Sequence, residues 1–138
     1  MDTDIHRSTP IPATVTISSD NEPVETRGFF CELVGGFVLE FGIGGDKYTI
    51  THMGEETTFE CVGVQAYSIV LRKEVYRSML KTPFGDLPFS VRDSAFSAVT
   101  TDDAISLDIG YVLSIDGAAD DVRKIRIAAR FIKSGEEK

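Results

Sequence analysis

Only two cysteines and two histidines occur among the 138 residues, so the chain has few ligands for a soft metal ion. A structural zinc site needs about four clustered sulfur or nitrogen ligands. Here Cys31 and Cys61 lie in separate alternating apolar runs, His6 lies near the N-terminus, and His52 lies between the two cysteines. The sequence therefore excludes structural zinc, and we expect no metal or other cofactor. Each cysteine is expected to be a small, buried, reduced hydrophobe.

Long apolar segments are also lacking. No run approaches the roughly 18 apolar residues that a membrane-spanning helix requires. Residues 1–15 are acidic and polar, whereas a signal peptide has a basic segment followed by an apolar one. We therefore expect a soluble, cytoplasmic protein with no membrane partner.

The net charge of −8 opposes binding to nucleic acids, because their phosphates carry the same sign of charge. Two segments nevertheless carry local positive charge. Their basic residues are Arg72, Lys73, Arg77 and Lys81 in the first, and Arg123, Lys124, Arg126, Arg130 and Lys133 in the second. These stripes could hold a small anion or could pair with acids on neighbouring strands, and solvated stripes are the commoner case.

Helical periodicity is sustained nowhere for long, whereas period-two alternation is frequent. In residues 105–116 the odd positions are apolar and nearly all even positions are polar or small, which predicts a half-buried strand. Gly110, near its middle, suits a bulge or bend. A turn over 116–121 precedes a second alternating run over 122–132. These two runs predict a long C-terminal hairpin.

Shorter runs of the same kind precede this hairpin and are separated by turn residues. They cover residues 14–18, 29–33, 37–41, 47–53, 57–64, 67–73, 75–81 and 87–92. Residues 93–103 fit no clear pattern, and 94–98 could form one helical turn. About ten sequential strands with one apolar face can form a sandwich or a closed barrel.

We predict the second of these folds, because the strands are linked as hairpins and the C-terminal pair is long. The predicted fold is all-β, a single antiparallel barrel of about eight to ten strands over residues 11–133. Residues 1–10 and 134–138 are expected to be a disordered leader and tail.

No catalytic or nucleotide-binding motif is present: the chain has no P-loop, no dinucleotide fingerprint, no Gly-x-Ser-x-Gly elbow and no Cys-x-x-Cys. The glycine-rich segment 42–46 joins two strands and opens no helix, so it is read as a hairpin loop. The acid pairs at 102–103 and 120–121 lie in turns. We therefore expect a protein that is not an enzyme.

Polar residues that share parity with apolar neighbours are candidates for the barrel interior. Arg27 shares parity with Phe29 and Cys31, and His52 shares parity with Tyr48 and Ile50. Two alternatives remain open for the arginine: Gly28 turns it outward through a bulge, or it forms an ion pair at the barrel mouth. For the histidine, the alternative is a rim position satisfied by backbone or water.

Three further residues complete the candidate ligand-binding set. Arg72 ends an apolar run, and Arg77 shares parity with Val75 and Met79, so both could offer guanidinium forks to a carboxylate or phosphate. The alternative is that each pairs with a strand carboxylate. Tyr111 belongs to a bulky aromatic set expected to face inward, which indicates a small cavity. That set comprises Phe29, Phe37, Phe41, Phe59, Phe89, Tyr111 and Phe131.

Residues 70–72 and 79–89 resemble the corresponding stretch of the YwiB-like family of uncharacterised small bacterial proteins. The segment runs Val-Leu-Arg and then Met-Leu-Lys-Thr-Pro-Phe-Gly-Asp-Leu-Pro-Phe. The order of Gly28-Phe29, Leu39-Glu40-Phe41, residues 48–51 and the C-terminal hairpin fits the same pattern, so the resemblance spans residues 14–132. One departure is Lys73-Glu74 after Arg72, where the family usually has a glycine two residues on.

The resemblance implies a calycin-like barrel of the type that includes lipocalins, and it implies no known activity or catalytic residue. We therefore hypothesise a non-enzymatic barrel that binds a small anionic or amphipathic ligand in its interior or mouth. The alternative is a structural or protein-interaction module whose interior is filled by its own side chains and which could form a homodimer.

Overall fold

The computed structural model describes residues 9–19, 22–63, 66–116 and 118–132, and these residues form ten strands and no helix. The strands are β1 (Ile11–Ser18), β2 (Val24–Leu33), β3 (Gly36–Ile43), β4 (Asp46–Met53), β5 (Glu56–Val62), β6 (Tyr67–Leu71), β7 (Tyr76–Thr82), β8 (Gly85–Thr100), β9 (Ala104–Ile115) and β10 (Asp121–Phe131). Residues 1–8 of the predicted leader, residue 133 of the predicted barrel and the whole predicted tail, residues 134–138, lie outside the described residues. Nothing in the described part is a helix long and apolar enough to cross a membrane.

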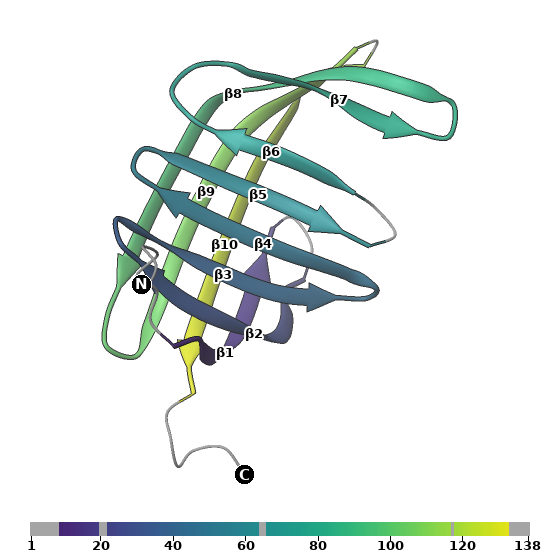
Figure 1. The fold of residues 1–138 in the computed structure, drawn as a ribbon. Coiled ribbons are helices and arrows are strands. Elements are labelled where there is room, and N and C mark those ends of the chain that lie inside the picture. The colour runs from purple at the N-terminus through teal and green to yellow at the C-terminus, as the bar shows by residue number, and fades with distance from the viewer. Residues whose placement is uncertain (1–8, 20–21, 64–65, 117, 133–138) are drawn as a thin grey trace, which may run out of the picture.

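All ten strands belong to one antiparallel sheet with the order β6-β5-β4-β3-β2-β1-β10-β9-β8-β7. The sheet curls on itself, so that the long strands β8, β9 and β10 form one wall and β2 to β6 cross in front of them (Figure 1). The end strands β6 and β7 lie next to each other in the chain but do not pair. The structure is thus a nearly closed barrel, which confirms the predicted fold class. We call the unpaired junction between β6 and β7 the seam.

The register of the C-terminal hairpin matches its sequence pattern. Ile125 lies opposite Ile109, and Ile127 lies opposite Leu107, with all four side chains on the inner face. Leu107 and Ile127 are fully buried. Burial of a side chain of this size stabilises a fold by roughly 1.5–3 kcal/mol. Several such side chains of the hairpin belong to the core, so the hairpin contributes substantially to stability. The predicted shared core of the two strands is confirmed.

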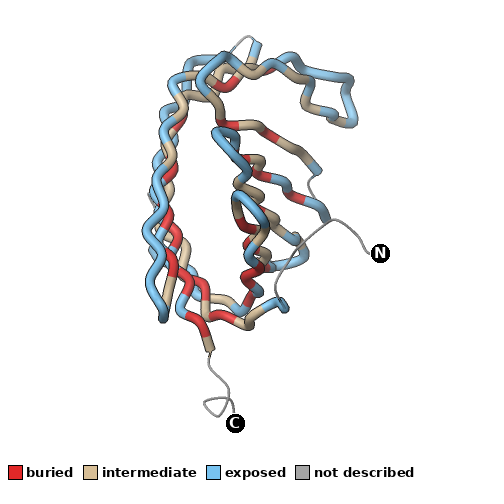
Figure 2. The backbone as a smooth tube through the Cα atoms, turned by 60° about the vertical axis from the view of Figure 1, so that its left-hand side comes forward, coloured by how far each residue is buried: buried red, intermediate tan, exposed pale blue. Residues whose placement is uncertain are grey.

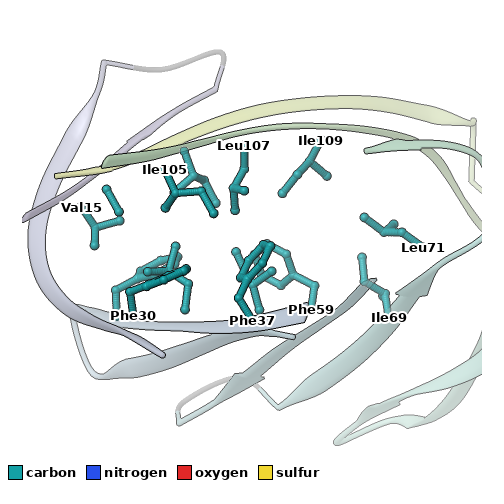
Figure 3. Close-up of a cluster of buried hydrophobic side chains, with 14 of the residues drawn as sticks. Val15, Phe30, Phe37, Phe59, Ile69, Leu71, Ile105, Leu107 and Ile109 are labelled. Atoms are coloured by element: carbon teal, nitrogen blue, oxygen red, sulfur yellow. The ribbon is translucent and has the colours of Figure 1, made fainter. Parts of the chain in front are cut away.

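Side chains from both walls meet in the barrel interior (Figure 3). The buried positions line the inside of the tube, and exposed positions alternate with them on the outside (Figure 2). Six of the seven predicted inward aromatics are buried, and the exception is Phe29, which is 54% exposed. Cys31 and Cys61 are buried thiols, as expected.

The segment that fitted no pattern, residues 93–103, is largely strand, because β8 continues to Thr100. The helical turn considered for 94–98 is therefore wrong. A β-bulge lies between Arg92 and Ala95, opposite Val112 and Gly110 of β9. Asp93, inside this bulge, has a positive φ of 52°. The bulge disrupts the alternation of inward and outward side chains, so the sequence of this segment shows no regular period of two. The bulge therefore lies in β8, opposite Gly110, and the β9–β10 ladder is regular at Gly110 itself.

Candidate ligand-binding cavity

A cavity of about 240 Å³ lies at the seam. Its walls come from β6, β7, β8, β9 and β10, so both end strands of the sheet contribute. Most of the lining is apolar and consists of Ile69, Leu80, Phe89, Leu113 and Ile115. Three polar side chains complete it, namely Tyr67, Tyr111 and Arg123. The cavity therefore combines an apolar body with one polar end.

Arg123 reaches the cavity because of its parity in β10. It is paired with Tyr111 across the β9–β10 ladder, two positions from the inward Ile125. Its charge lies close enough to the Tyr111 hydroxyl to act on the pKa of that phenol. Its Nε also donates to Oδ2 of Asp121 at a distance of 2.6 Å. This ion pair raises the pKa of Arg123 above its usual value, so the side chain is a permanent cation at the cavity mouth.

Tyr67 is the most strongly perturbed group at the site. Burial, followed by the proximity of Cys61, Tyr48 and Tyr111, raises its pKa to about 12, whereas the charge of Arg123 acts in the opposite direction. Burial also raises the pKa of Tyr111, against the opposing effect of Arg123. Both phenols are therefore protonated at neutral pH. Each can donate a hydrogen bond to an anionic or carbonyl oxygen.

Tyr48 and Cys61 extend this polar end along the barrel wall. They lie opposite each other in the β4–β5 ladder, and Cys61 is also paired with Tyr67 of β6. A side-chain hydrogen bond joins Tyr48 and Cys61, and burial raises the pKa of both groups. A thiol whose pKa is raised is a weak nucleophile at neutral pH. Cys61 is thus paired with Tyr67 beside the cavity and is not one of the residues that line it.

His52 faces inward, as its parity predicts, but it lies at the opposite end of the barrel. Its Nδ1 is 2.9 Å from the hydroxyl of buried Thr57, and its ring stacks on Phe96 with centroids 4.7 Å apart. Thr57 is four residues from Cys61 along β5, a separation of roughly 13 Å in an extended strand. His52 is therefore held by Thr57 and Phe96 and does not line the cavity.

Arg72 holds the turn that connects the two end strands. Its Nη2 donates to the carbonyl oxygen of Val75 at 3.2 Å, and its guanidinium carbon lies 5.4 Å from the centroid of the Tyr76 ring. Its buried Nε has no hydrogen-bond partner within the described part of the chain. The side chain therefore fixes the turn at the seam. Among the described residues its partners are a backbone carbonyl and an aromatic ring, and not the strand carboxylate of the alternative prediction. It is not among the residues that line the cavity.

Arg27 and Arg77 are both exposed, so the interior position considered for Arg27 is wrong, and Arg77 is not among the residues that line the cavity. In β2 the inward residues are Gly28 and Phe30, and Phe29 faces outward with the arginine. The ladders on both sides of β2 are regular at Gly28, so no bulge is responsible. Three consecutive apolar residues, at 29–31, left the parity of this strand ambiguous.

Of the five predicted site residues, only Tyr111 lines the cavity. Arg123 and Tyr67 were not among the predicted residues, although the sequence contains a signal for each. Arg123 shares parity with Ile125 and Ile127, which is the criterion that selected Arg27. Tyr67 begins an alternating run with Ile69 and Leu71, but its approach to Tyr111 depends on how the sheet curls.

The side chains that line the cavity are suited to binding a ligand. Its polar groups are two phenols and a guanidinium, which donate hydrogen bonds and supply one positive charge. Within the described ranges, no group of three or more His, Cys, Asp or Glu side chains is placed to hold a metal ion.

These features define a ten-stranded antiparallel barrel with a small, partly open interior cavity. Among solved structures, the chain is similar to the crystal structure of the ywiB protein from Bacillus subtilis, with a TM-score of 0.64 over 90% of this chain and 91% of that chain. The two sequences are 12% identical, so the likeness is one of fold. It confirms the YwiB-like fold that residues 70–72 and 79–89 indicated. No family model matches the chain, and no curated protein does.

Proposed function

We propose that the protein is a non-enzymatic binding module that holds a small amphipathic anion in the cavity at the seam. The observation that carries this proposal is the position of Arg123 beside Tyr111 and Tyr67, at one end of an otherwise apolar cavity. A guanidinium and two protonated phenols are suited to a carboxylate or similar group. The apolar body of the ligand would lie against Leu80 and Phe89.

The size of the cavity limits the ligand. Small-molecule sites usually have volumes of about 300–1,000 Å³, so 240 Å³ lies below the usual range. Since one water occupies about 30 Å³ in the liquid, the space corresponds to about eight water-sized groups. The ligand is therefore a short-chain or single-ring compound.

The local charge limits the head group. Arg123 supplies one positive charge, and Asp121 already forms an ion pair with its Nε. A singly charged head group leaves the site with a modest negative charge, whereas a doubly charged phosphate adds further repulsion. A monoanion is favoured for this reason. The two buried cysteine thiols support a reducing compartment such as the cytoplasm.

Titration of the protein with hexanoate, measured by isothermal titration calorimetry, tests this proposal. Arg123→Met removes the charge-assisted contact and is expected to weaken binding by about tenfold to a hundredfold. Arg130→Met is the matched control, because Arg130 is exposed on the same strand outside the cavity. Its affinity is expected to equal that of the parent.

Native mass spectrometry of freshly purified protein provides a second test. A small molecule that co-purifies with the parent and is absent from Arg123→Met supports the proposal. An empty parent that binds neither hexanoate nor benzoate contradicts it. A bare homodimer would instead favour the self-filled interaction module.

A further inference from the structure

The end strand β7 has one open edge. Within the part of the chain that the structure describes, its ladder partner is β8 alone. The hairpin that these strands form extends beyond the body of the barrel (Figure 1). An unpaired strand edge presents backbone donors and acceptors that can pair with another strand.

The position of Pro88 shows which residues of β7 direct their backbone groups to this edge. Pro88 lies opposite Met79, has no N–H group, and its carbonyl oxygen accepts from the N–H of Asp116 at 3.1 Å, on the side of β9. Met79 and Pro88 are therefore a non-hydrogen-bonded pair of the β7–β8 ladder. By alternation, Arg77, Met79 and Lys81 direct their N–H and C=O groups away from β8.

The side chains of the same three residues lie on the outer face. Arg77 and Lys81 are exposed, and Met79 between them is 51% exposed. Lys81 lies 3.6 Å from Oδ2 of Asp86 in a solvent-exposed pair, which is a weak interaction. Phe84, at the tip of the hairpin, is 99% exposed and adds apolar surface beside this edge. The edge thus presents a cation, an apolar residue and a second cation, with aligned backbone groups.

We propose that the open edge of β7 binds an extended peptide with an acidic residue, an apolar residue and an acidic residue at alternate positions. Added as an antiparallel strand, such a peptide places its apolar residue opposite Met79 and its acids opposite Arg77 and Lys81. Opposite charges at paired positions stabilise a ladder, and like charges destabilise it. The proposal does not rest on the proposed function, although this edge borders the same seam as the cavity.

A second copy of the chain fits this edge poorly. Antiparallel pairing of two β7 strands about Met79 would place Arg77 of each copy opposite Lys81 of the other. Charged residues on an edge strand are a common device against such self-pairing. The same two cations therefore disfavour a homodimer and favour an acidic partner.

The test uses two fluorescein-labelled heptapeptides, Thr-Glu-Thr-Val-Thr-Glu-Thr and the same peptide with lysine in place of glutamate. We expect the acidic peptide to bind at least about tenfold more tightly by fluorescence polarisation. In the double variant Arg77→Glu/Lys81→Glu the preference is expected to reverse. Met79→Pro removes one edge donor without breaking the β7–β8 ladder, and it is expected to abolish binding of both peptides.

Arg123→Met is the control for the cavity, because it leaves the β7 edge intact and is expected to bind the acidic peptide normally. Amide hydrogen exchange adds a readout of position, with new protection expected at residues 77, 79 and 81. Equal binding of both peptides, protection elsewhere, or no binding to the parent would overturn the proposal. A concentration-dependent dimer that excludes the peptide would assign the edge to a second copy instead.

Discussion

Tyr111 of β9 and Arg123 of β10 lie opposite each other in the β9–β10 ladder, and the charge of the guanidinium acts to lower the pKa of the phenol. Arg123 is the permanent cation of the cavity, and Tyr111 belongs to its buried wall. Tyr111 is only 8% exposed, whereas the side chain of Arg123 is 47% exposed. The buried phenol therefore lies beside an arginine whose hydrogen-bond partner, Asp121, lies at the surface.

Removal of the Tyr111 hydroxyl tests this relationship. Tyr111→Phe is expected to lower the free energy of unfolding by about 1 kcal/mol, because the polar contact between the buried phenol and the Arg123 guanidinium is lost. Urea denaturation measures the change. Tyr76→Phe is the control, since no hydrogen bond of the Tyr76 hydroxyl occurs among the described residues, and its effect is expected to stay within about 0.5 kcal/mol. Equal losses in both variants would contradict the assignment.

The raised pKa of Tyr67 predicts a loss of stability at alkaline pH. The folded-state pKa of about 12 exceeds the ordinary value of 10.0, so the folded protein binds the phenolic proton more tightly than the unfolded chain does. This contribution is fully present below about pH 10 and is lost as the pH rises through about 12. Tyr67→Phe is expected to have a smaller decline in melting temperature over that window. A parallel decline in the parent and the variant would show that Tyr67 is not responsible.

Gly28 is expected to be intolerant of a side chain. A Cβ atom there would collide with the backbone carbonyl oxygen of Glu40 on β3 and would lie 3.0 Å from the Cβ of Phe41. Gly28→Ala should therefore lower the free energy of unfolding by about 3 kcal/mol. Gly42→Ala is the matched control, because the nearest atom to its new Cβ would be 3.6 Å away. A Gly28→Ala variant as stable as the control would contradict the close approach of β2 and β3.

The bulge in β8 makes Asp93 sensitive to the shape of its replacement. Its φ of 52° is tolerated by Asn and Gly but disfavoured for β-branched residues. Asp93→Val is expected to lower the free energy of unfolding by about 1–2 kcal/mol, and Asp93→Asn by less than about 0.5 kcal/mol. Both substitutions remove the exposed ion pair with Arg92, so the difference between them isolates the backbone term. Identical melting curves would argue against a left-handed conformation at this position.

The sequence by itself determined the fold class and the inward face of the long hairpin. Alternation is a local property, so residues 105–116 and 122–132 revealed which side chains face the core before their pairing was known. The inward parity of His52 and the buried state of Cys61 followed from the same pattern, whereas Cys31 is buried on the face that it shares with the exposed Phe29. The alternation did not reveal a strand at residues 93–100, because a bulge shifts the parity of the side chains partway along β8.

Only the tertiary structure decided the inward face of β2 and the location of the cavity. The apolar run Phe29-Phe30-Cys31 fits either face, and the choice rests on the close packing of Gly28 against β3 and of Phe30 against Phe131, whose ring centroids are 5.0 Å apart. The cavity unites side chains from β6 to β10 because the sheet curls until its ends meet without pairing. Such closure depends on the accumulated twist of ten strands, which no single segment of the sequence encodes.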